Sequence, residues 1–247
     1  MFDLDGVIYI DDTMIEGADR AIEHVRSKGL PCRFTTNTTT RSVKSMHRKL
    51  VQLGLPISQF EEFGVIRAAQ KYLERQGNPI CHFLLTDDPR EDFMQFAQSD
   101  KNPTHLVVGD VGKVWDYQLM QRCFDMIMAG AKIVALHKGK YWQTDNGLRM
   151  DIGAFVAGLE YVTDTEATVI GKPSADFFQL ALDDIGLKAE QVVMIGDDLT
   201  NDIGGAQAVG MKAVLVRTGK FRQELLDRSS VKPDLVIDSI ADLPDLV

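Results

Sequence analysis

Cysteine is scarce in this sequence: the 247 residues include three, Cys32, Cys81 and Cys123. An odd number of widely separated cysteines fits neither a disulfide framework nor the ligand spacing of a zinc site, so we expect reduced, buried thiols and a cytoplasmic protein. Long apolar runs are also missing, since no stretch approaches the length that spans a bilayer, and the acidic start is unlike a signal peptide. We therefore expect no membrane partner.

Basic residues are outnumbered, with 27 Lys and Arg against 36 Asp and Glu and a formal net charge of -9. Neither nucleic acid nor an anionic membrane gains attraction from such a protein, so we expect no nucleic-acid partner. To bind a phosphorylated substrate, such a protein would need a local positive charge at the site, either a metal ion or a lysine. Hydrophobic residues make up 45% of the chain, enough for the core of one large or two medium domains.

Alternating strand and helix patterns run along the chain without an internal repeat. Helical spacing of apolar residues predicts helices at residues 19–30, 42–54, 64–77, 116–130, 174–187 and 202–210. Short apolar runs predict strands at residues 31–40, 80–88, 104–110, 131–137, 167–173, 191–198 and 212–219. This alternation is typical of a parallel sheet, and the polar segment 137–153 indicates a hairpin or an extended loop.

The pattern of predicted elements changes after Gly77-Asn78-Pro79, where three apolar strands begin to alternate with new helices. The simplest division gives one α/β domain built from both ends of the chain, residues 1–78 and 166–247. A second α/β domain is then inserted at residues 79–165.

The opening segment MFDLDGVIYI places two aspartates, Asp3 and Asp5, one residue apart at the end of an apolar start. Residues i and i+2 of a strand face the same side, so both carboxylates can converge if a strand ends here. Gly6 then lets the backbone turn sharply. The alternative is a frayed start whose acids are merely solvated, and the decapeptide alone does not decide between them.

Polar residues follow the ends of four predicted strands, where ligands bind in open α/β sheets. They are Asp3 and Asp5, then Thr36 and Asn37, then Lys172, and finally Asp197, Asp198 and Asp202. Taken alone, each group is typical of a cap, a turn or a loop. Together they place acids, a hydroxyl and a lysine where one cleft is expected.

Phosphoryl transfer needs this set of groups. Carboxylates hold Mg²⁺ through oxygen ligands, and the metal neutralises the phosphate so that a nucleophilic carboxylate is not repelled. A lysine and a hydroxyl bind the remaining phosphate oxygens. A second acid, two residues after the nucleophile, can protonate the leaving oxygen and later activate water.

In chain order, DLDG, the Thr-Asn pair, GKP and GDDLTND resemble the four motifs of the haloacid dehalogenase (HAD) superfamily of phosphatases. The resemblance covers nearly the whole chain. It implies that Asp3 is the nucleophile, which forms an aspartyl phosphate, and that Asp5 is the general acid and base. Thr36 would bind the phosphoryl oxygens, and Lys172 would hold the nucleophile and the phosphate.

The same resemblance implies a Mg²⁺ site. Its ligands would be the Asp3 carboxylate, the Asp5 backbone carbonyl and Asp197, with Asp202 as a ligand or as an acid behind the ligands. The family spacing G-D-x-x-x-x-D selects Asp197 and Asp202, so Asp198 is expected to belong to the loop.

The position of the insertion is similar to that of the class IIA members of the superfamily. About thirty residues separate the first two motifs, and some 135 separate the second from the third. The resemblance implies a Rossmann-like parallel-sheet core with an inserted α/β cap of the C2 type. Class IIA relatives often associate through their caps, so a homodimer through the cap is expected.

The cap is expected to contact the leaving group of a small phosphorylated substrate. The candidates form a basic and aromatic run in an acidic protein: His137, Lys138, Lys140, Tyr141 and Trp142. The alternative is a solvated hairpin with one aromatic side chain packed beneath it. Asn37 and Arg41, beside the second motif, are further substrate-side candidates.

One departure from the family pattern concerns the first strand, where only Met1 and Phe2 precede Asp3. Relatives carry several apolar residues at this point, so we expect this sequence to begin late relative to them. Three other functions remain: a dehalogenase, a phosphate-responsive receiver module, and a catalytically silent binding protein. A dehalogenase leaves the metal-binding acids unexplained, and the receiver has a different order of acids and no cap.

Overall fold

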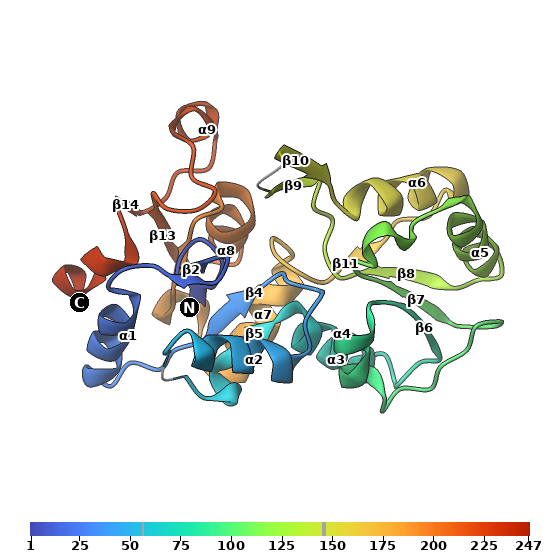
Figure 1. The fold of residues 1–247 in the computed structure, drawn as a ribbon, viewed down its shortest axis with the longest axis horizontal. Coiled ribbons are helices and arrows are strands. Elements are labelled where there is room, and N and C mark those ends of the chain that lie inside the picture. Colours follow the sequence, from blue (N-terminus) through green and yellow to red (C-terminus); the bar gives the residue numbers. More distant parts are fainter. Residues whose placement is uncertain (56, 145–146) are drawn as a thin grey trace. The chain divides into compact units, whose positions relative to one another are not determined.

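The computed structural model of the chain describes residues 1–55, 57–144 and 147–247 (Figure 1). Contacts group these residues into two units. The first unit contains Met1–Thr36, Met46–Gly64 and Lys172–Val247, and the second contains Asn37–Ser45 and Val65–Gly171. Each unit has its own parallel sheet.

The sheet of the first unit has six parallel strands in the order β14-β13-β12-β1-β4-β5. These strands are Leu235–Ile237 (β14), Lys212–Val216 (β13), Val193–Gly196 (β12), Phe2–Asp3 (β1), Phe34–Thr36 (β4) and Glu62–Gly64 (β5). The two-residue strand β1 is central, with Phe2 opposite Ile195 on one side and Phe34 on the other. Stacking of the Phe2 and Phe34 rings, with centroids 5.5 Å apart, anchors it within the apolar core.

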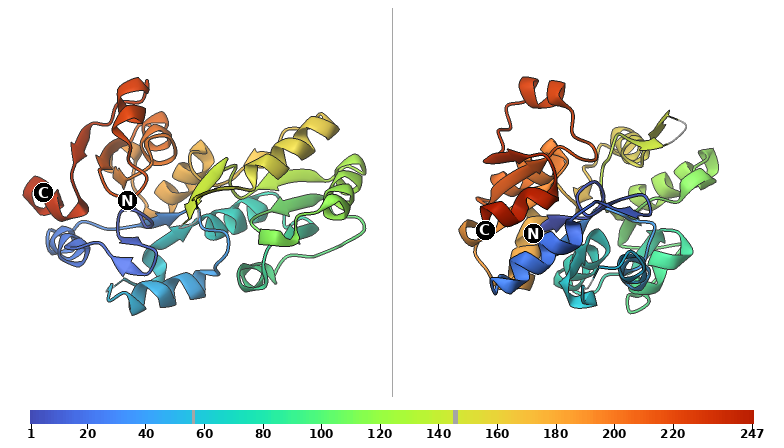
Figure 2. Two further views of the ribbon diagram at one scale, coloured as in Figure 1. Left: turned by 45° about the horizontal axis from the view of Figure 1, so that its top comes forward. Right: turned by 60° about the vertical axis from the view of Figure 1, so that its left-hand side comes forward.

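Helices and short turns surround this sheet. They are α1 (Ala18–Ser27), α7 (Ala175–Ile185), α8 (Gly205–Ala208), α9 (Gln223–Arg228), the 3-10 turns η1 (Gln59–Glu61), η4 (Ala189–Gln191) and η6 (Ile240–Leu246), and the π-helical turn η5 (Leu199–Gly204). Helix α1 buries Ala18, Ala21, Ile22 and Val25 along one face, as helical spacing predicts. It lies beside the C-terminal turn η6 (Figure 2).

A small hairpin follows β1. Its antiparallel strands are β2 (Tyr9–Ile10) and β3 (Thr13–Met14). Gly6 makes the turn out of β1 with a φ of 86°, a conformation that favours glycine, and its N–H donates to the carbonyl of Tyr9. The turn carries the chain away from the carboxyl end of β1, so that Asp3 and Asp5 flank the point where the backbone leaves the sheet.

The sheet of the second unit has four parallel strands in the order β11-β8-β7-β6. These strands are Thr168–Val169 (β11), Lys132–Ala135 (β8), His105–Val108 (β7) and Cys81–Leu84 (β6). Helices α5 (Tyr117–Met128) and α6 (Gly153–Thr163) pack together against it and close a second apolar core (Figure 1). The unit also holds α3 (Val65–Arg75), α4 (Asp87–Arg90), η2 (Glu91–Phe93), η3 (Gly112–Val114), and the antiparallel strands β9 (Tyr141–Thr144) and β10 (Gly147–Met150).

Two aspartates of the second unit cap the start of helix α2 (Val43–Gln52). The Asp88 carboxylate accepts hydrogen bonds from the Ser42 N–H at 2.8 Å and from the Ser45 hydroxyl at 2.7 Å. The Asp92 carboxylate accepts from the Val43 N–H, also at 2.8 Å. These bonds satisfy N–H groups that have no partner inside the helix, and they fix the segment that follows Thr36.

The predicted fold class is confirmed: a parallel-sheet α/β core accompanies a separate α/β unit with its own sheet. The predicted helices and apolar strands occur, and residues 141–150 form the strands of a hairpin. The sequence did not indicate the short strands β5 and β14 or helix α6. Cys32, Cys81 and Cys123 are buried and free, as predicted.

The predicted domain boundaries at residues 79 and 165 stay a prediction. Grouping by contacts assigns α3 to the second unit, because the Gln70 amide donates to the carbonyl of Asp92 and α3 packs against η2. It also assigns β11 to the second unit, because β11 pairs with β8. No helix in the described part of the chain is both long enough and apolar enough to cross a bilayer.

Candidate active site

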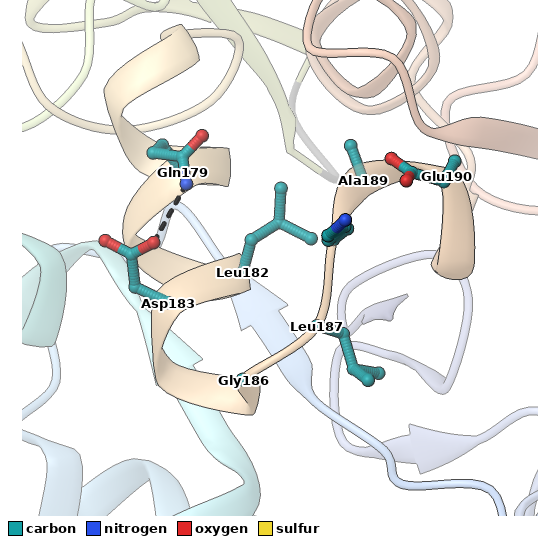
Figure 3. A pocket seen from close by; sticks show the side chains of 8 residues that line it. Gln179, Leu182, Asp183, Gly186, Leu187, Ala189 and Glu190 are labelled. Atoms are coloured by element: carbon teal, nitrogen blue, oxygen red, sulfur yellow. Dashed lines mark hydrogen bonds between the residues drawn. The ribbon is translucent and has the colours of Figure 1, made fainter.

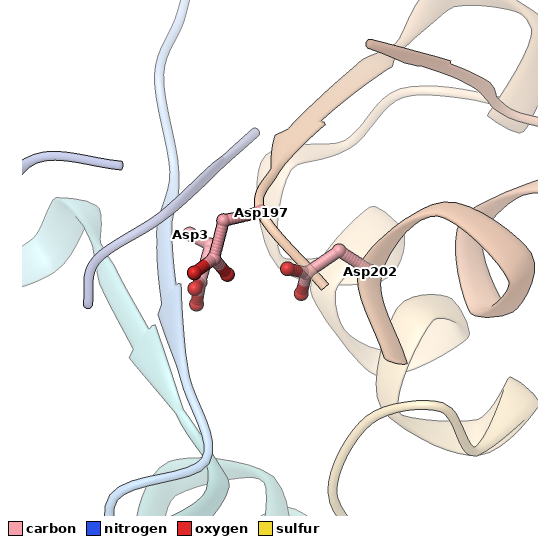
Figure 4. Close-up of side chains that lie close together, drawn as sticks. All are labelled: Asp3, Asp197 and Asp202. Carbon is pink, nitrogen blue, oxygen red and sulfur yellow. The ribbon is translucent and has the colours of Figure 1, made fainter. Parts of the chain in front are cut away.

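Three buried aspartates meet at the carboxyl ends of β1 and β12 in the first unit (Figure 4). Asp3 is the last residue of β1, Asp197 directly follows β12, and Asp202 lies in the π-helical turn η5. Each offers a carboxylate oxygen, and these oxygens all lie within 4.8 Å of one another. Adjacent parallel strands end at one edge of the sheet, so residues almost 200 positions apart are brought into one cluster.

Lys172 is the counter-ion inside this cluster. Its ammonium donates to Asp3 Oδ1 at 2.5 Å and to Asp202 Oδ1 at 2.7 Å, and its side chain is 3% exposed. Burial favours the neutral amine, but Asp202 and Asp3 outweigh it and raise the pKa of Lys172 above its ordinary value. The lysine therefore carries a fixed positive charge against the nucleophile candidate.

The cluster has the donor set of a divalent cation site. Three carboxyl groups share one ammonium in a buried place, so their ionised forms would carry an excess of negative charge that a cation can neutralise. Asp197 Oδ1 is buried and has no hydrogen-bond partner among the residues that the structure describes, whereas Asp197 Oδ2 accepts from the Lys220 N–H at 2.7 Å. An orphaned carboxylate oxygen facing two further carboxylates fits an oxygen-liganded ion such as Mg²⁺.

Burial and mutual repulsion raise the pKa values of two of these acids. Burial, and then the charges of Asp3 and Asp202, raise the pKa of Asp197 well above its usual value. Burial and the Asp3 carboxylate raise the pKa of Asp202 to about 6. A bound cation would remove this repulsion and favour the ionised forms of both acids.

A loop after β13 holds Asp197 in place. The Thr218 hydroxyl donates to the carbonyl of Gly6, and the Lys220 N–H donates to Asp197 Oδ2. Gly6 and Gly219 pack against the same oxygen, because a Cβ on either would lie 2.0 Å from Asp197 Oδ2. Only residues without a side chain fit at these two positions.

Asp5 lies beside the cluster, in the turn that leaves β1. It keeps an exposed surface, yet desolvation by the surrounding chain raises its pKa, against the opposing charges of Lys220 and Lys49. Lys49 fixes the adjacent hairpin: its ammonium donates to the carbonyl of Asp11 at 2.6 Å and lies 4.2 Å from the centre of the Tyr9 ring. An acid with a raised pKa at a fixed place suits proton transfer to and from a substrate.

The other predicted site residues take different places. Thr36 is buried at the end of β4, next to the strand of Asp3. Asn37 and the exposed Arg41 lie in the second unit, as do His137 and Lys138. Lys138 is paired with Glu160 at 2.5 Å, and His137 Nδ1 lies 3.9 Å from Asp151 Oδ2. The Trp142 side chain lies outside the described part of the structure.

Sequence reasoning missed the loop of Thr218, Gly219 and Lys220. The available signal was the RTG segment that ends the strand predicted at residues 212–219, because β13 ends at the same sheet edge as the strands of Asp3 and Asp197. Asp198 was expected to belong to the loop after β12. The Asp198 carboxylate caps the turn η5, because it accepts from the Thr200 and Asn201 N–H groups.

A shallow hollow of about 420 Å³ lies elsewhere in the first unit (Figure 3). It is lined by the end of α7 and by η4, and Gln179 in its wall donates to Asp183 at 2.8 Å. Because η4 precedes β12, the hollow lies at the amino-terminal edge of the sheet, opposite the carboxylate cluster. None of its lining residues is a predicted site residue.

Comparisons with known proteins agree with this geometry. Residues 1–97 match the family described as haloacid dehalogenase-like hydrolase, and residues 169–243 match a HAD-hydrolase-like family. The chain is 39% identical to haloacid dehalogenase-like hydrolase domain-containing protein 2 from Homo sapiens over 97% of this chain and 91% of that protein. It is 38% identical to human phospholysine phosphohistidine inorganic pyrophosphate phosphatase over 100% of this chain and 93% of that protein.

Among solved structures, the p-nitrophenyl phosphatase from Archaeoglobus fulgidus has the same fold. It superposes with a TM-score of 0.93 and 26% identity, and the match covers 100% of this chain and 98% of that chain. The match extends over both units.

Proposed function

The chain belongs to the phosphatases of the haloacid dehalogenase-like hydrolase family, and from this premise we propose that it is a Mg²⁺-dependent hydrolase of a small phosphorylated metabolite. The observation that carries the proposal is the ammonium of Lys172, which joins Asp3 to Asp202 beside the orphaned oxygen of Asp197.

In this mechanism Asp3 is the nucleophile. Its carboxylate attacks phosphorus, a new P–O bond forms, and the ester P–O bond breaks. Lys172 donates a hydrogen bond to Asp3 and orients its oxygen, and the Thr36 hydroxyl binds a phosphoryl oxygen. The product of this step is a phosphate on the Asp3 carboxylate.

Asp5 moves the protons in both steps. Its raised pKa lets it hold a proton, which it gives to the oxygen of the departing alcohol. The resulting carboxylate then takes a proton from the water that attacks the aspartyl phosphate. Phosphate leaves, and Asp3 and Asp5 return to their starting states.

A Mg²⁺ ion would be held by the carboxylates of Asp3 and Asp197 and the backbone carbonyl of Asp5, with Asp202 as a further ligand or as an acid behind the ligands. When bound, it supplies positive charge that lowers the repulsion between the phosphate and the acids. His137, Lys138, Asn37 and Arg41 would contact the leaving group from the second unit, and a homodimer through that unit would be consistent with its role as a cap.

The test is hydrolysis of p-nitrophenyl phosphate with and without Mg²⁺, by the wild type and by Asp3→Asn. Asn preserves the shape of Asp3 and can still accept from Lys172, but it cannot act as a carboxylate nucleophile. We expect activity that needs both the metal and Asp3. The exposed Asp176→Asn is the matched control and should retain full activity. A folded wild type without activity would instead favour a binding protein.

A further inference from the structure

Lys220 sits at the carboxylate cluster without belonging to the four family motifs. It is the fourth residue after β13, and its backbone N–H donates to Asp197 Oδ2 at 2.7 Å. The preceding Thr218 hydroxyl donates to the carbonyl of Gly6, which ties this loop to the turn after β1. The main chain of Lys220 is therefore fixed beside the site, whatever its side chain does.

The Lys220 side chain is not needed to hold the site together. Its ammonium lies 3.7 Å from Asp198 Oδ2, and the side chain is 62% exposed. Asp198 already accepts from the Thr200 N–H, the Asn201 N–H and the Asn201 amide, at 2.8 to 3.1 Å. Exposed ion pairs of this length contribute little to stability.

The two lysines of the site differ in whether their ammonium groups can reach a ligand. Lys172 is 3% exposed and donates hydrogen bonds to Asp3 and Asp202. The ammonium of Lys220 donates no hydrogen bond to any described residue, and its side chain is largely exposed, so its N–H donors are available to a ligand.

The loop of Lys220 also lies against the turn that carries Asp5. The Thr218 hydroxyl donates to the carbonyl of Gly6, the residue after Asp5, and a Cβ on Gly219 would lie 2.6 Å from the Gly6 Cα. Asp5 is the acid that would protonate the leaving oxygen, so a cation in this loop is close to the leaving group as well.

We propose that Lys220 is a specificity-determining residue, which binds an oxyanion carried by the leaving group of the substrate. The assignment rests on the proposed function. An anionic leaving group would otherwise be repelled by Asp5, Asp197 and Asp198, and Lys220 offsets this repulsion with a positive charge and free N–H donors. The oxyanion is a carboxylate or a second phosphoryl group, since both present the same acceptor chemistry to an ammonium.

The experiment compares kcat/KM for four substrates. 2-Phosphoglycolate carries a carboxylate, inorganic pyrophosphate carries a second phosphoryl group, ethyl phosphate has an uncharged leaving group, and O-phosphoethanolamine has a cationic one. Each is assayed at saturating Mg²⁺ with the wild type, Lys220→Met, Lys220→Arg and the control Lys212→Met. Lys212 is an exposed lysine at the opposite end of the same strand, β13.

We expect Lys220→Met to lower kcat/KM about tenfold or more for the anionic substrates, mainly through KM, and to change it less than about twofold for ethyl phosphate. The activity on O-phosphoethanolamine should rise or stay the same. Lys220→Arg should retain most of the preference, and Lys212→Met should match the wild type. A larger loss for 2-phosphoglycolate identifies a carboxylate, and a larger loss for pyrophosphate identifies a phosphoryl group.

Equal losses on ethyl phosphate and on the anionic substrates would overturn the assignment, because Lys220 would then act on the transferred phosphate or the metal. A wild type that prefers ethyl phosphate to both anionic substrates would overturn it too. A folded wild type that hydrolyses none of the four, nor p-nitrophenyl phosphate, would refute the proposed function itself.

Discussion

The ammonium of Lys172 lies 2.5 Å from Asp3 Oδ1 and 2.7 Å from Asp202 Oδ1, and all three side chains are buried. One cation therefore serves two carboxylates with different tasks, the nucleophile candidate and an acid of the metal site. Removing it would leave both without a counter-charge in a largely buried place.

Lys172→Ala should lower kcat by about 100-fold or more, because the nucleophile loses its orientation and the phosphate loses a fixed positive charge. Lys138→Ala and Lys140→Ala should each change kcat only a few-fold, since Lys138 is paired with Glu160 inside the second unit. The measurement is steady-state hydrolysis of p-nitrophenyl phosphate, with circular dichroism to confirm folding. Comparable losses at all three lysines would mean that the phosphate binds elsewhere.

Mg²⁺ affinity should weaken as pH falls through about 6, the value to which burial and Asp3 raise the pKa of Asp202. Below this value Asp202 must release a proton before it can act at the metal site, so each further pH unit should weaken the apparent affinity by up to about tenfold. Calorimetric Mg²⁺ titrations between pH 5 and 8 measure the effect. An affinity that is flat across this range would exclude Asp202 from metal binding.

The metal-free protein should show the opposite trend in stability. Asp202 titrates at 3.8 when unfolded and has a pKa of about 6 when folded, so between these values the folded state holds more protons. The contribution of Asp202 to folding stability therefore falls as pH rises through this window. Thermal midpoints in EDTA at pH 5 and pH 8 should show a larger loss for the wild type than for Asp202→Asn, which has no such proton to release.

The sequence predicted the fold where apolar residues form a helical period or an unbroken run. Helix α3 shows such a period and the segment of β12 such a run, whereas β5 has one apolar side chain, between Glu62 and Gly64, and β14 is a run of only three residues. Helix α6 was missed for another reason: its GAFVAGLEYVT segment is apolar on all sides, with Tyr161 and Val162 exposed and Val156 buried, so no single apolar face marks it.

Within the site, the side chains were predictable and the backbone contacts were not. Asp3, Lys172 and Asp202 have side chains whose chemistry suits phosphoryl transfer, and Asp3 and Asp202 follow from two neighbouring strands, β1 and β12, that end at one sheet edge. Thr218 and Gly219 act through a hydroxyl bond to a carbonyl and through the absence of a Cβ. Such contacts depend on which loops meet in space, and no residue pattern in a single sequence specifies that.

Asp88→Ala should lower the free energy of unfolding by about 2 kcal/mol, because the start of α2 loses bonds from the Ser42 N–H and the Ser45 hydroxyl. The neighbouring Asp87 is exposed, so Asp87→Ala is the matched control and should be close to neutral. Urea unfolding at equilibrium measures both. Equal effects for the two variants would show that the cap bonds do not stabilise this segment.

Gly219→Ala should weaken Mg²⁺ binding by about tenfold or more while leaving the protein folded. Gly219 has a φ of 59°, and an added Cβ would lie 2.0 Å from Asp197 Oδ2 and 2.6 Å from the Gly6 Cα. The carboxylate of Asp197 would have to move, and displacing a metal ligand from its supporting contacts typically costs 10- to 100-fold in affinity.

The control for this variant is Gly186→Ala, at the end of α7. Gly186 has a φ of 72°, and an added Cβ would meet nothing within 4 Å. Both variants bear the cost of about 1 kcal/mol for placing alanine in the left-handed region, but only Gly219→Ala disturbs Asp197. Calorimetric Mg²⁺ titration and urea unfolding of both variants separate the two effects. If the two variants lose the same stability and bind Mg²⁺ equally well, Asp197 does not depend on the loop after β13, and its orientation is set by β12 alone.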